Sequence, residues 1–437
     1  MGLFSNWIDW FLGWPLIAYA ITIGVVFTFI FRFVQIRYFF TAFHSLFAPQ
    51  KKKTSREMSP FDAFLNTLSA NLGNGSVAGA AVAVFTGGPG AGIWVMIIGL
   101  LLMAVRFAEV YASTMAGAKA PANSVLGGPM LYLKDVIGGS FLSYSYAVAC
   151  LIFSLVVGNA MQTHAISWCI EVTWGVQPII MAIVLTAFIC YVVMGGSHRI
   201  IAVSDRIVPI KVIVFFLSSA IVIFYNAHTF FDSLALMYAS AFNPSAMAGG
   251  AAGLAVMLAM KSGMNLSLTA TESGLGTAAI LFGYTGSKDP MGSALMGMMS
   301  TFVSSLVCFI VVLCVVMSGA WDSGLTSTAL TIASFSTAFG WFGGWIVSFL
   351  SISFGMGVLV TFAYVARATW LCVTNGRYGN VFPLLYCLAA FLGAIAEVHV
   401  LWLAVSIING LMLIINLFGL LYLIPAIRRD MISRGSE

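Results

Sequence analysis

Hydrophobic residues in this chain form long, nearly continuous runs, and the polar residues gather in short segments between them. A helix needs about 20 apolar residues to cross the hydrocarbon core of a bilayer. Eleven runs reach or approach that length, so we expect an all-α integral membrane protein with eleven transmembrane helices. The runs cover residues 14–31, 61–85, 91–115, 143–166, 178–194, 208–225, 246–282, 293–317, 345–372, 381–396 and 401–424.

The composition agrees with a chain whose surface mostly faces lipid. The 437 residues are 61% hydrophobic and 8% charged, and the mean hydropathy is +1.02, whereas a soluble domain is about half apolar and a quarter charged. Asp9 is the one charged residue before the first run, and no basic segment precedes that run, so we expect no cleaved signal peptide. The seven cysteines show no CxxC spacing or histidine pairing, so we predict no zinc site, disulfide framework or other cofactor.

Basic residues fall on alternate loops, which predicts the orientation because basic loops stay in the cytoplasm. Every second loop lacks Lys and Arg, and Lys261, inside the seventh run, is the exception. We therefore expect a multi-pass protein of a bacterial inner membrane, with the N-terminus outside and the C-terminus cytoplasmic. The basic residues assigned to the cytoplasmic side are Arg32, Arg37, Lys51, Lys52, Lys53, Arg56, Arg106, Lys119, Lys134, Arg199, Arg206, Lys211, Lys288, Arg367, Arg377, Arg428, Arg429 and Arg434. The first six of these could also attract anionic membrane lipid.

Two runs carry polar, glycine-rich patches that a plain transmembrane helix does not favour. The second run reads SANLGNGSVAG at 69–79. Glycine costs about 1 kcal/mol per residue in a helix, and Asn and Ser compete for backbone hydrogen bonds. The seventh run, 246–282, is too long for one plain helix and carries KSGMNLS at 261–267, followed by Glu272. Both runs are predicted to be interrupted, although close helix packing on small residues would account for Gly79 alone.

The positions of the interrupted runs indicate an internal repeat. Each is the first of five runs, and because five is odd, the two halves are inverted relative to one another. Corresponding interrupted helices in inverted halves point to a transporter's substrate site near the middle of the bilayer. We expect an N-terminal helix with a basic loop (1–58), a first five-helix repeat (59–226), an inverted second repeat (227–427) and a cytoplasmic tail (428–437).

Seven sequence blocks stand out along the chain: FDAFLNTLSANLGNGSVAGAA (61–81), GGPGAGIW (87–94), RFAEVY (106–111), GGPMLYL (127–133), GNAMQ (158–162), GGSHRIIAVSDRIVP (195–209) and NGLMLIINL (409–417). In order and spacing they resemble the alanine or glycine:cation symporter family, and the resemblance covers most of the chain. It implies a leucine-transporter-type fold of two inverted five-helix repeats with one extra N-terminal helix. It also implies symport of alanine, glycine or a similar small neutral amino acid, with sodium as the usual cation.

The same resemblance implies which residues bind the substrate. The backbone around the glycines of the second run would face the substrate carboxylate, and Gln162 would face its polar groups. Residues of the seventh run would lie beside the substrate side chain. The full set is Asn71, Gly73, Asn74, Gly75, Gln162, Ser262, Gly263, Met264 and Thr361.

Sodium is the coupling ion that the resemblance implies, bound between the second and ninth runs. Carbonyls of Ala70 and Gly73 would supply part of its shell. The family supplies hydroxyls from a Ser-Thr pair in the ninth run, but the matching positions here are Met356 and Gly357, which have none. Ser351 and Ser353, a turn or more away, are the nearby hydroxyls that could replace them if the helix is shifted.

Charged and polar residues inside the runs leave a second coupling ion open. Arg106 and Glu109 are spaced i, i+3, which predicts a structural ion pair. Glu272 is expected to brace the seventh run, but a buried carboxyl or imidazole can titrate, so proton coupling through Glu272 or His164 is the alternative.

Other classes of protein find little support in the sequence. A channel would need a repeated filter or a charged ring, and an intramembrane enzyme would need a nucleophile with a base or clustered metal ligands. The chain shows neither, and its five histidines are dispersed. A proton-coupled carrier of a different small amino acid, or a sensor on the same fold that does not transport, remains open. No nucleic-acid partner is expected, and the oligomeric state is not predicted.

Overall fold

The computed structural model describes residues 14–47, 58–119, 127–242, 251–395 and 398–434, and every regular element in these ranges is helical. The helices are α2 (Trp14–Ile30), α3 (Val34–Arg37), α4 (Phe39–Phe47), α5 (Pro60–Asn71), α6 (Asn74–Gly87), α7 (Ala91–Lys119), α8 (Pro129–Tyr132), α9 (Gly139–Leu155), α10 (Met161–Trp174), α11 (Pro178–Met194), α12 (Gly196–Tyr225), α13 (Phe230–Phe242), α15 (Ala251–Thr271), α16 (Thr277–Gly283), α17 (Pro290–Met317), α18 (Ser327–Phe339), α19 (Phe342–Val373), α20 (Phe382–Ile395) and α21 (Val398–Ser433). A π-helical turn, Val156–Ala160, joins α9 to α10. The basic residues at 51–56 and the predicted run ends at 246 and 396 lie outside the described residues.

Among the residues that the structure describes, six stretches are long and apolar enough to cross a membrane, or seven if the bent pair α5–α6 counts as one span. The six are α7, α9 with α10, α12, α17, α19 and the 407–433 part of α21. The shorter apolar helices α2, α11 and α20 have 17, 17 and 14 residues. At a rise of 1.5 Å per residue, each falls short of the roughly 30 Å hydrocarbon core. The all-helical membrane architecture is confirmed, and the count of eleven spans remains a prediction.

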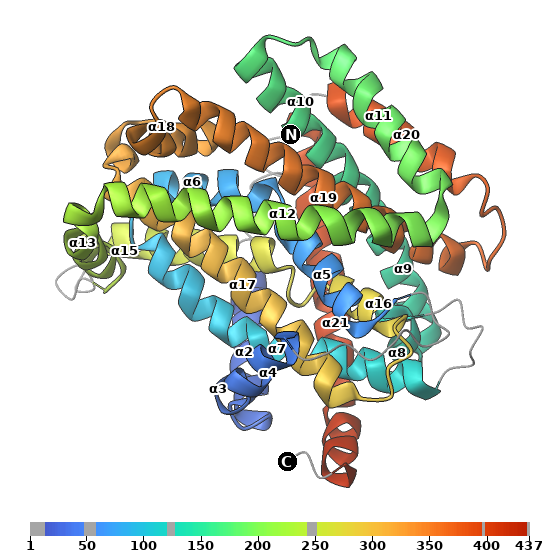
Figure 1. The fold of residues 1–437 in the computed structure, drawn as a ribbon. Coiled ribbons are helices and arrows are strands. Elements are labelled where there is room, and N and C mark those ends of the chain that lie inside the picture. The colour runs from blue at the N-terminus through green and yellow to red at the C-terminus, as the bar shows by residue number, and fades with distance from the viewer. Residues whose placement is uncertain (1–13, 48–57, 120–126, 243–250, 396–397, 435–437) are drawn as a thin grey trace.

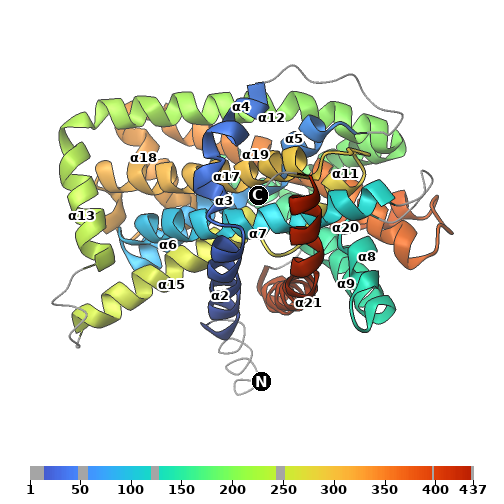
Figure 2. The same cartoon turned by 90° about the horizontal axis from the view of Figure 1, so that it is seen from below.

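The first helix is oriented differently from most of the others. It packs against α7, and Figure 2 shows α2 running across the direction of α12 instead of beside it. The role of α2 as an additional span stays a prediction.

The two interrupted runs lie together near the middle of the helix bundle. α5 packs against α16 and α6 packs against α15, so the two broken helices run in opposite directions (Figure 1). Around them, α17 packs along α7, α12 and α19 pack together beside α5, and α11 pairs with α20 at the edge.

Local sequence signals explain where several helices begin. Ser59 caps α5: its hydroxyl accepts from Asp62 N at 3.1 Å, and the Asp62 carboxylate accepts from Ser59 N at 2.9 Å. Pro60 occupies the first helical position, where a missing N–H costs nothing. Asp289 caps α17 in a similar way, followed by Pro290. The starts of the first broken helix and of α17 are therefore fixed by local caps.

Both interruptions are present, and the second begins at the end of the polar stretch predicted for it. The second run bends by 41° between α5 and α6, at Leu72 and Gly73 within the predicted patch. In the seventh run, 261–267 is continuous helix inside α15. The break lies further along, at 272–276, where Glu272, Gly274 and Gly276 have φ values of 50°, 96° and 82°.

Candidate functional site

The first break leaves polar backbone groups without helical partners. Gly73 caps α6 without a side-chain hydrogen bond, and Ser76 N bonds to Gly73 O at 3.0 Å instead of continuing the α-helical ladder to Leu72 O. The first N–H groups of α6 and the last carbonyls of α5 are therefore available to other partners. These N–H groups, at the positive end of the helix dipole, favour a negative charge.

Gln162 lies directly against this break. Asn74 Nδ2 donates to Gln162 Oε1 at 3.3 Å, and a Cβ added to Gly73 would lie 3.5 Å from the same oxygen. Gln162 Nε2 donates to Val157 O at 3.3 Å, within the π-helical turn that precedes α10. Such turns often occur at functional sites, because they reposition side chains along a helix. The structure thus brings Gly73, Asn74 and Gln162 together, although Asn74 and Gln162 are 88 residues apart in the sequence.

Two further predicted residues carry buried polar atoms without a hydrogen-bond partner. Both polar atoms of the Asn71 amide are unpaired, although the residue is only 3% exposed, and the Thr361 hydroxyl is unpaired at 0% exposure. Buried polar groups are normally hydrogen-bonded, so each of these atoms has capacity for a ligand. Gly75, by contrast, is exposed, and a Cβ added there would meet nothing within 4 Å.

Predicted residues of the seventh run lie at the other end of α6. Ser262 Oγ is 3.0 Å from Thr86 Oγ1, within hydrogen-bond distance. A Cβ added to Gly263 would lie 2.5 Å from Ala91 O, so this glycine permits close helix packing. Met264 is buried in α15. These contacts of Ser262 and Gly263 do not involve Gln162 or Asn74.

A lysine that the sequence assigned to the cytoplasmic side is buried beside the first break. Lys211 on α12 is 0% exposed, and its ammonium donates to Leu72 O at 3.0 Å, Ser69 O at 3.2 Å and Ser69 Oγ at 3.4 Å. The charge therefore lies at the end of α5, next to the carbonyls expected to bind sodium. The available sequence signal was that Lys211 falls inside the predicted run 208–225.

The second break is held by side chains from several helices. Arg106 and Glu109 form the predicted ion pair at 3.2 Å, fully buried in α7. The guanidinium also donates to Thr271 O, the last residue of α15. Glu109 Oε1 accepts from Gly276 N at 3.0 Å. One buried pair thus contacts both ends of the break.

Three more side chains complete this support. Asn416 of α21 donates to Glu109 Oε1 and to Gly274 O, both at 2.8 Å. Tyr146 of α9 donates to Leu275 O at 2.7 Å. Glu272 accepts from Thr277 Oγ1 at 2.8 Å across the break, as expected for a bracing residue. Side chains from several helices therefore bind the backbone groups freed at the second break. At the first break, Lys211 binds Leu72 O and Ser69 O, and Gln162 lies against Gly73.

Comparison with known proteins decides the family. The model of the sodium:alanine symporter family matches residues 2–433. The chain belongs to the sodium:alanine symporter family. The family is one of membrane transporters and not of enzymes, so the sequence resemblance is confirmed.

Individual relatives of this symporter family match over nearly the full length. An uncharacterized transporter of Haemophilus influenzae is 30% identical over 95% of this chain and 92% of its own. The sodium/alanine symporter AgcS of Methanococcus maripaludis is 28% identical, over 92% and 89%. The probable sodium/glutamine symporter GlnT of Bacillus subtilis is 27% identical, over 93% and 85%. The names of the last two relatives thus refer to two different amino acids.

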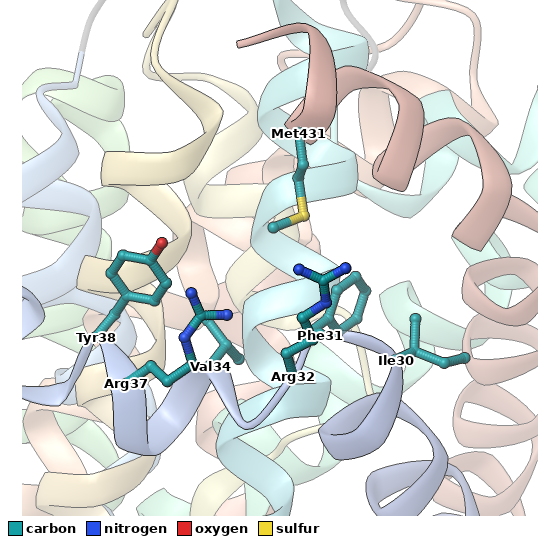
Figure 3. A pocket seen from close by; sticks show the side chains of 7 residues that line it. All are labelled: Ile30, Phe31, Arg32, Val34, Arg37, Tyr38 and Met431. Atoms are coloured by element: carbon teal, nitrogen blue, oxygen red, sulfur yellow. The ribbon is translucent and has the colours of Figure 1, made fainter. Parts of the chain in front are cut away.

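A surface hollow in this symporter family member lies away from the first break. It is lined by the turn between α2 and α3, including Arg32 and Arg37, and by Met431 of α21 (Figure 3). Arg32 has a φ of 53°, and the Arg37 guanidinium lies 5.5 Å from the Tyr38 ring centroid. Both arginines are exposed and come from the basic segment expected to meet anionic lipid. No residue of either break lines this hollow.

Proposed function

We propose that the protein is a secondary transporter that carries a small neutral amino acid through the first break. The observation that carries this proposal is the juxtaposition of the free α6 N-terminus at Gly73 with the amides of Asn74 and Gln162. A half-helix N-terminus suits the carboxylate of an amino acid, and neighbouring amide groups suit its other polar atoms. Family membership supports a transport function for this arrangement.

The proposed substrate site takes part of the residue set that the sequence implied. Gly73, Asn74 and Gln162 form its centre, because they are in contact with one another. Asn71 and Thr361 join it because their buried polar atoms lack protein partners. Gly75 lies next to this centre in sequence and leaves open space beside it. Ser262 and Gly263 are left out, because their contacts are with Thr86 and Ala91 instead, and a role for Met264 remains a prediction.

We also propose that transport uses eleven spans, with inverted repeats at 59–226 and 227–427. The antiparallel packing of α5–α6 against α16 and α15 supports this arrangement, since inverted repeats place their broken helices side by side in opposite directions. Alternating access would then arise from rocking of one group of helices against another around the breaks. More side-chain hydrogen bonds hold the second break than the first, so we propose that the helices move at the first break.

The experiment that tests the transport proposal is uptake of a radiolabelled amino-acid panel by proteoliposomes that contain the purified protein. We expect uptake of alanine, glycine or a similar small neutral amino acid, competed by the unlabelled compound. Relatives named for alanine and for glutamine make both of these amino acids essential members of the panel. Absence of saturable uptake for every member of the panel would reject the proposed function.

The orientation gives a separate prediction for intact cells. A single cysteine at Asp232 or Asp322, in a background without the seven native cysteines, should react with an impermeant thiol reagent applied outside. A cysteine at Lys288 should react only after the cells are opened. All three positions are exposed in the structure, so a difference in labelling would report the side of the membrane and not burial. The opposite labelling pattern would overturn the orientation.

A further inference from the structure

Oxygen atoms surround the Lys211 ammonium at the first break, as they would surround a bound metal cation. Three oxygens surround the Lys211 ammonium on the α5 side, and all belong to Ser69 and Leu72. On the other side, the Phe354 ring centroid lies 5.3 Å from Nζ, within the range of a cation–π interaction. Carbonyl and hydroxyl oxygens freed by an unwound helix are also the groups that bind sodium in transporters of this kind.

The charge of Lys211 is not balanced by an acidic partner. Lys211 forms no ion pair within the described part of the chain, whereas Arg106 pairs with Glu109 and Arg434 pairs with Asp430. Burying an unpaired ammonium is costly, so its burial requires compensation by neutral oxygens and the aromatic ring. The pocket around Nζ therefore selects a positive charge without supplying a negative one.

Position 357, on the helix opposite the break, has no room for a side-chain hydroxyl. A Cβ added to Gly357 would lie 2.5 Å from Lys211 Nζ and 2.7 Å from Ser69 Oγ. A serine or threonine at position 357 would therefore collide with the ammonium. Of the two serines that could replace it, Ser351 and Ser353, the second donates its hydroxyl to Leu350 O of its own helix at 3.0 Å. The residues present thus fit an ammonium at this position better than a sodium ion.

We propose that the Lys211 ammonium occupies the cation position at the first break, so that this chain binds and transports its substrate without sodium. The transport part of this inference rests on the proposed function, and the cation part does not.

The first test measures sodium binding directly, independently of transport. The purified wild-type protein in detergent is incubated with ²²Na⁺ in a scintillation proximity assay. We expect no saturable binding. In the variant Lys211→Met/Gly357→Ser, which removes the ammonium and supplies a hydroxyl, we expect saturable binding. Wild-type binding as strong as that of the double variant would overturn the proposal, whether or not the protein proves to transport an amino acid.

The second test measures uptake by proteoliposomes in sodium chloride and in choline chloride at the same pH. We expect equal initial rates, whereas a sodium-coupled carrier should differ by about fivefold or more. Lys211→Met should reduce uptake by about tenfold or more, because Leu72 O and Ser69 O lose their buried donor. The matched control is Lys261→Met, which removes a half-buried lysine from α15 and should leave uptake unchanged. Wild-type uptake that requires sodium would overturn the proposal.

Discussion

Replacing Glu109 with alanine is expected to destabilise the protein by about 3–5 kcal/mol, the usual cost of removing one partner from a buried ion pair. The Arg106 guanidinium would stay fully buried without its carboxylate, and Gly276 N would lose its acceptor. Asn416 would lose one of its two acceptors at the second break. The loss should appear as a lower apparent melting temperature in detergent, followed by fluorescence-detected size-exclusion chromatography.

Two variants distinguish this explanation from a general sensitivity to lost charges. Arg434→Ala removes the exposed partner of the pair with Asp430, and surface pairs contribute less than about 1 kcal/mol. Its melting temperature should therefore stay close to the wild-type value. Glu109→Gln keeps an oxygen for Gly276 N but loses the charge, so its melting temperature should fall between those of the wild type and Glu109→Ala. An alanine variant as stable as Arg434→Ala would mean that the ion pair does not hold the second break.

Replacing Gln162 with alanine is expected to weaken substrate binding by about 1–3 kcal/mol, or roughly 5- to 150-fold. In a closed site no water replaces the lost Gln162 amide. The polar groups of the substrate and the Asn74 amide would therefore lose a hydrogen-bond partner. The measurement is equilibrium binding of the amino acid that gives the highest uptake in the panel.

A matched control exists in another buried amide. Gln35 is 5% exposed and donates to Thr28 Oγ1 at 2.9 Å, away from both breaks. Gln35→Ala removes a similar hydrogen bond and should leave substrate affinity unchanged. Asn74→Ala should weaken binding, and the effects of Asn74→Ala and Gln162→Ala should not add, because the two side chains are in contact. Unchanged affinity in Gln162→Ala would place the substrate elsewhere.

The sequence located the first break because its signal is local. Ser69 to Gly79 combines glycine, asparagine and serine in a short stretch, and the bend at Leu72 and Gly73 lies inside it. The second break begins only at Glu272, the end of its polar stretch, because polarity alone does not interrupt a helix. Thr269, for example, donates its hydroxyl to Asn265 O at 2.8 Å within α15, which satisfies it without unwinding. The actual break depends on positive φ values at Gly274 and Gly276, which the polar pattern does not report.

Contacts between distant segments explain what the sequence could not predict. Lys211 and Leu72 are 139 residues apart in the sequence. The rule that basic residues stay on the cytoplasmic side already accounted for Lys211 at a helix end, so its position did not point to the break. The ion pair of Arg106 with Glu109 was predictable from its i, i+3 spacing, but its contacts with Thr271 and Gly276 were not. Pairings of this kind depend on how helices meet, which hydropathy and charge along the chain do not specify.

The attachment of Lys211 to α12 has a thermodynamic consequence. A free cation that enters with the substrate and leaves on the other side transfers the energy of its electrochemical gradient to each cycle. An ammonium that keeps its proton and is bound covalently to the carrier returns with the empty protein, so at this position it contributes no net movement of charge. The position can stabilise the closed arrangement of the first break, but unless the lysine releases and regains that proton it cannot drive accumulation. Concentrative uptake would need an energy source elsewhere in the cycle, and without one the protein would equilibrate or exchange its substrate across the membrane.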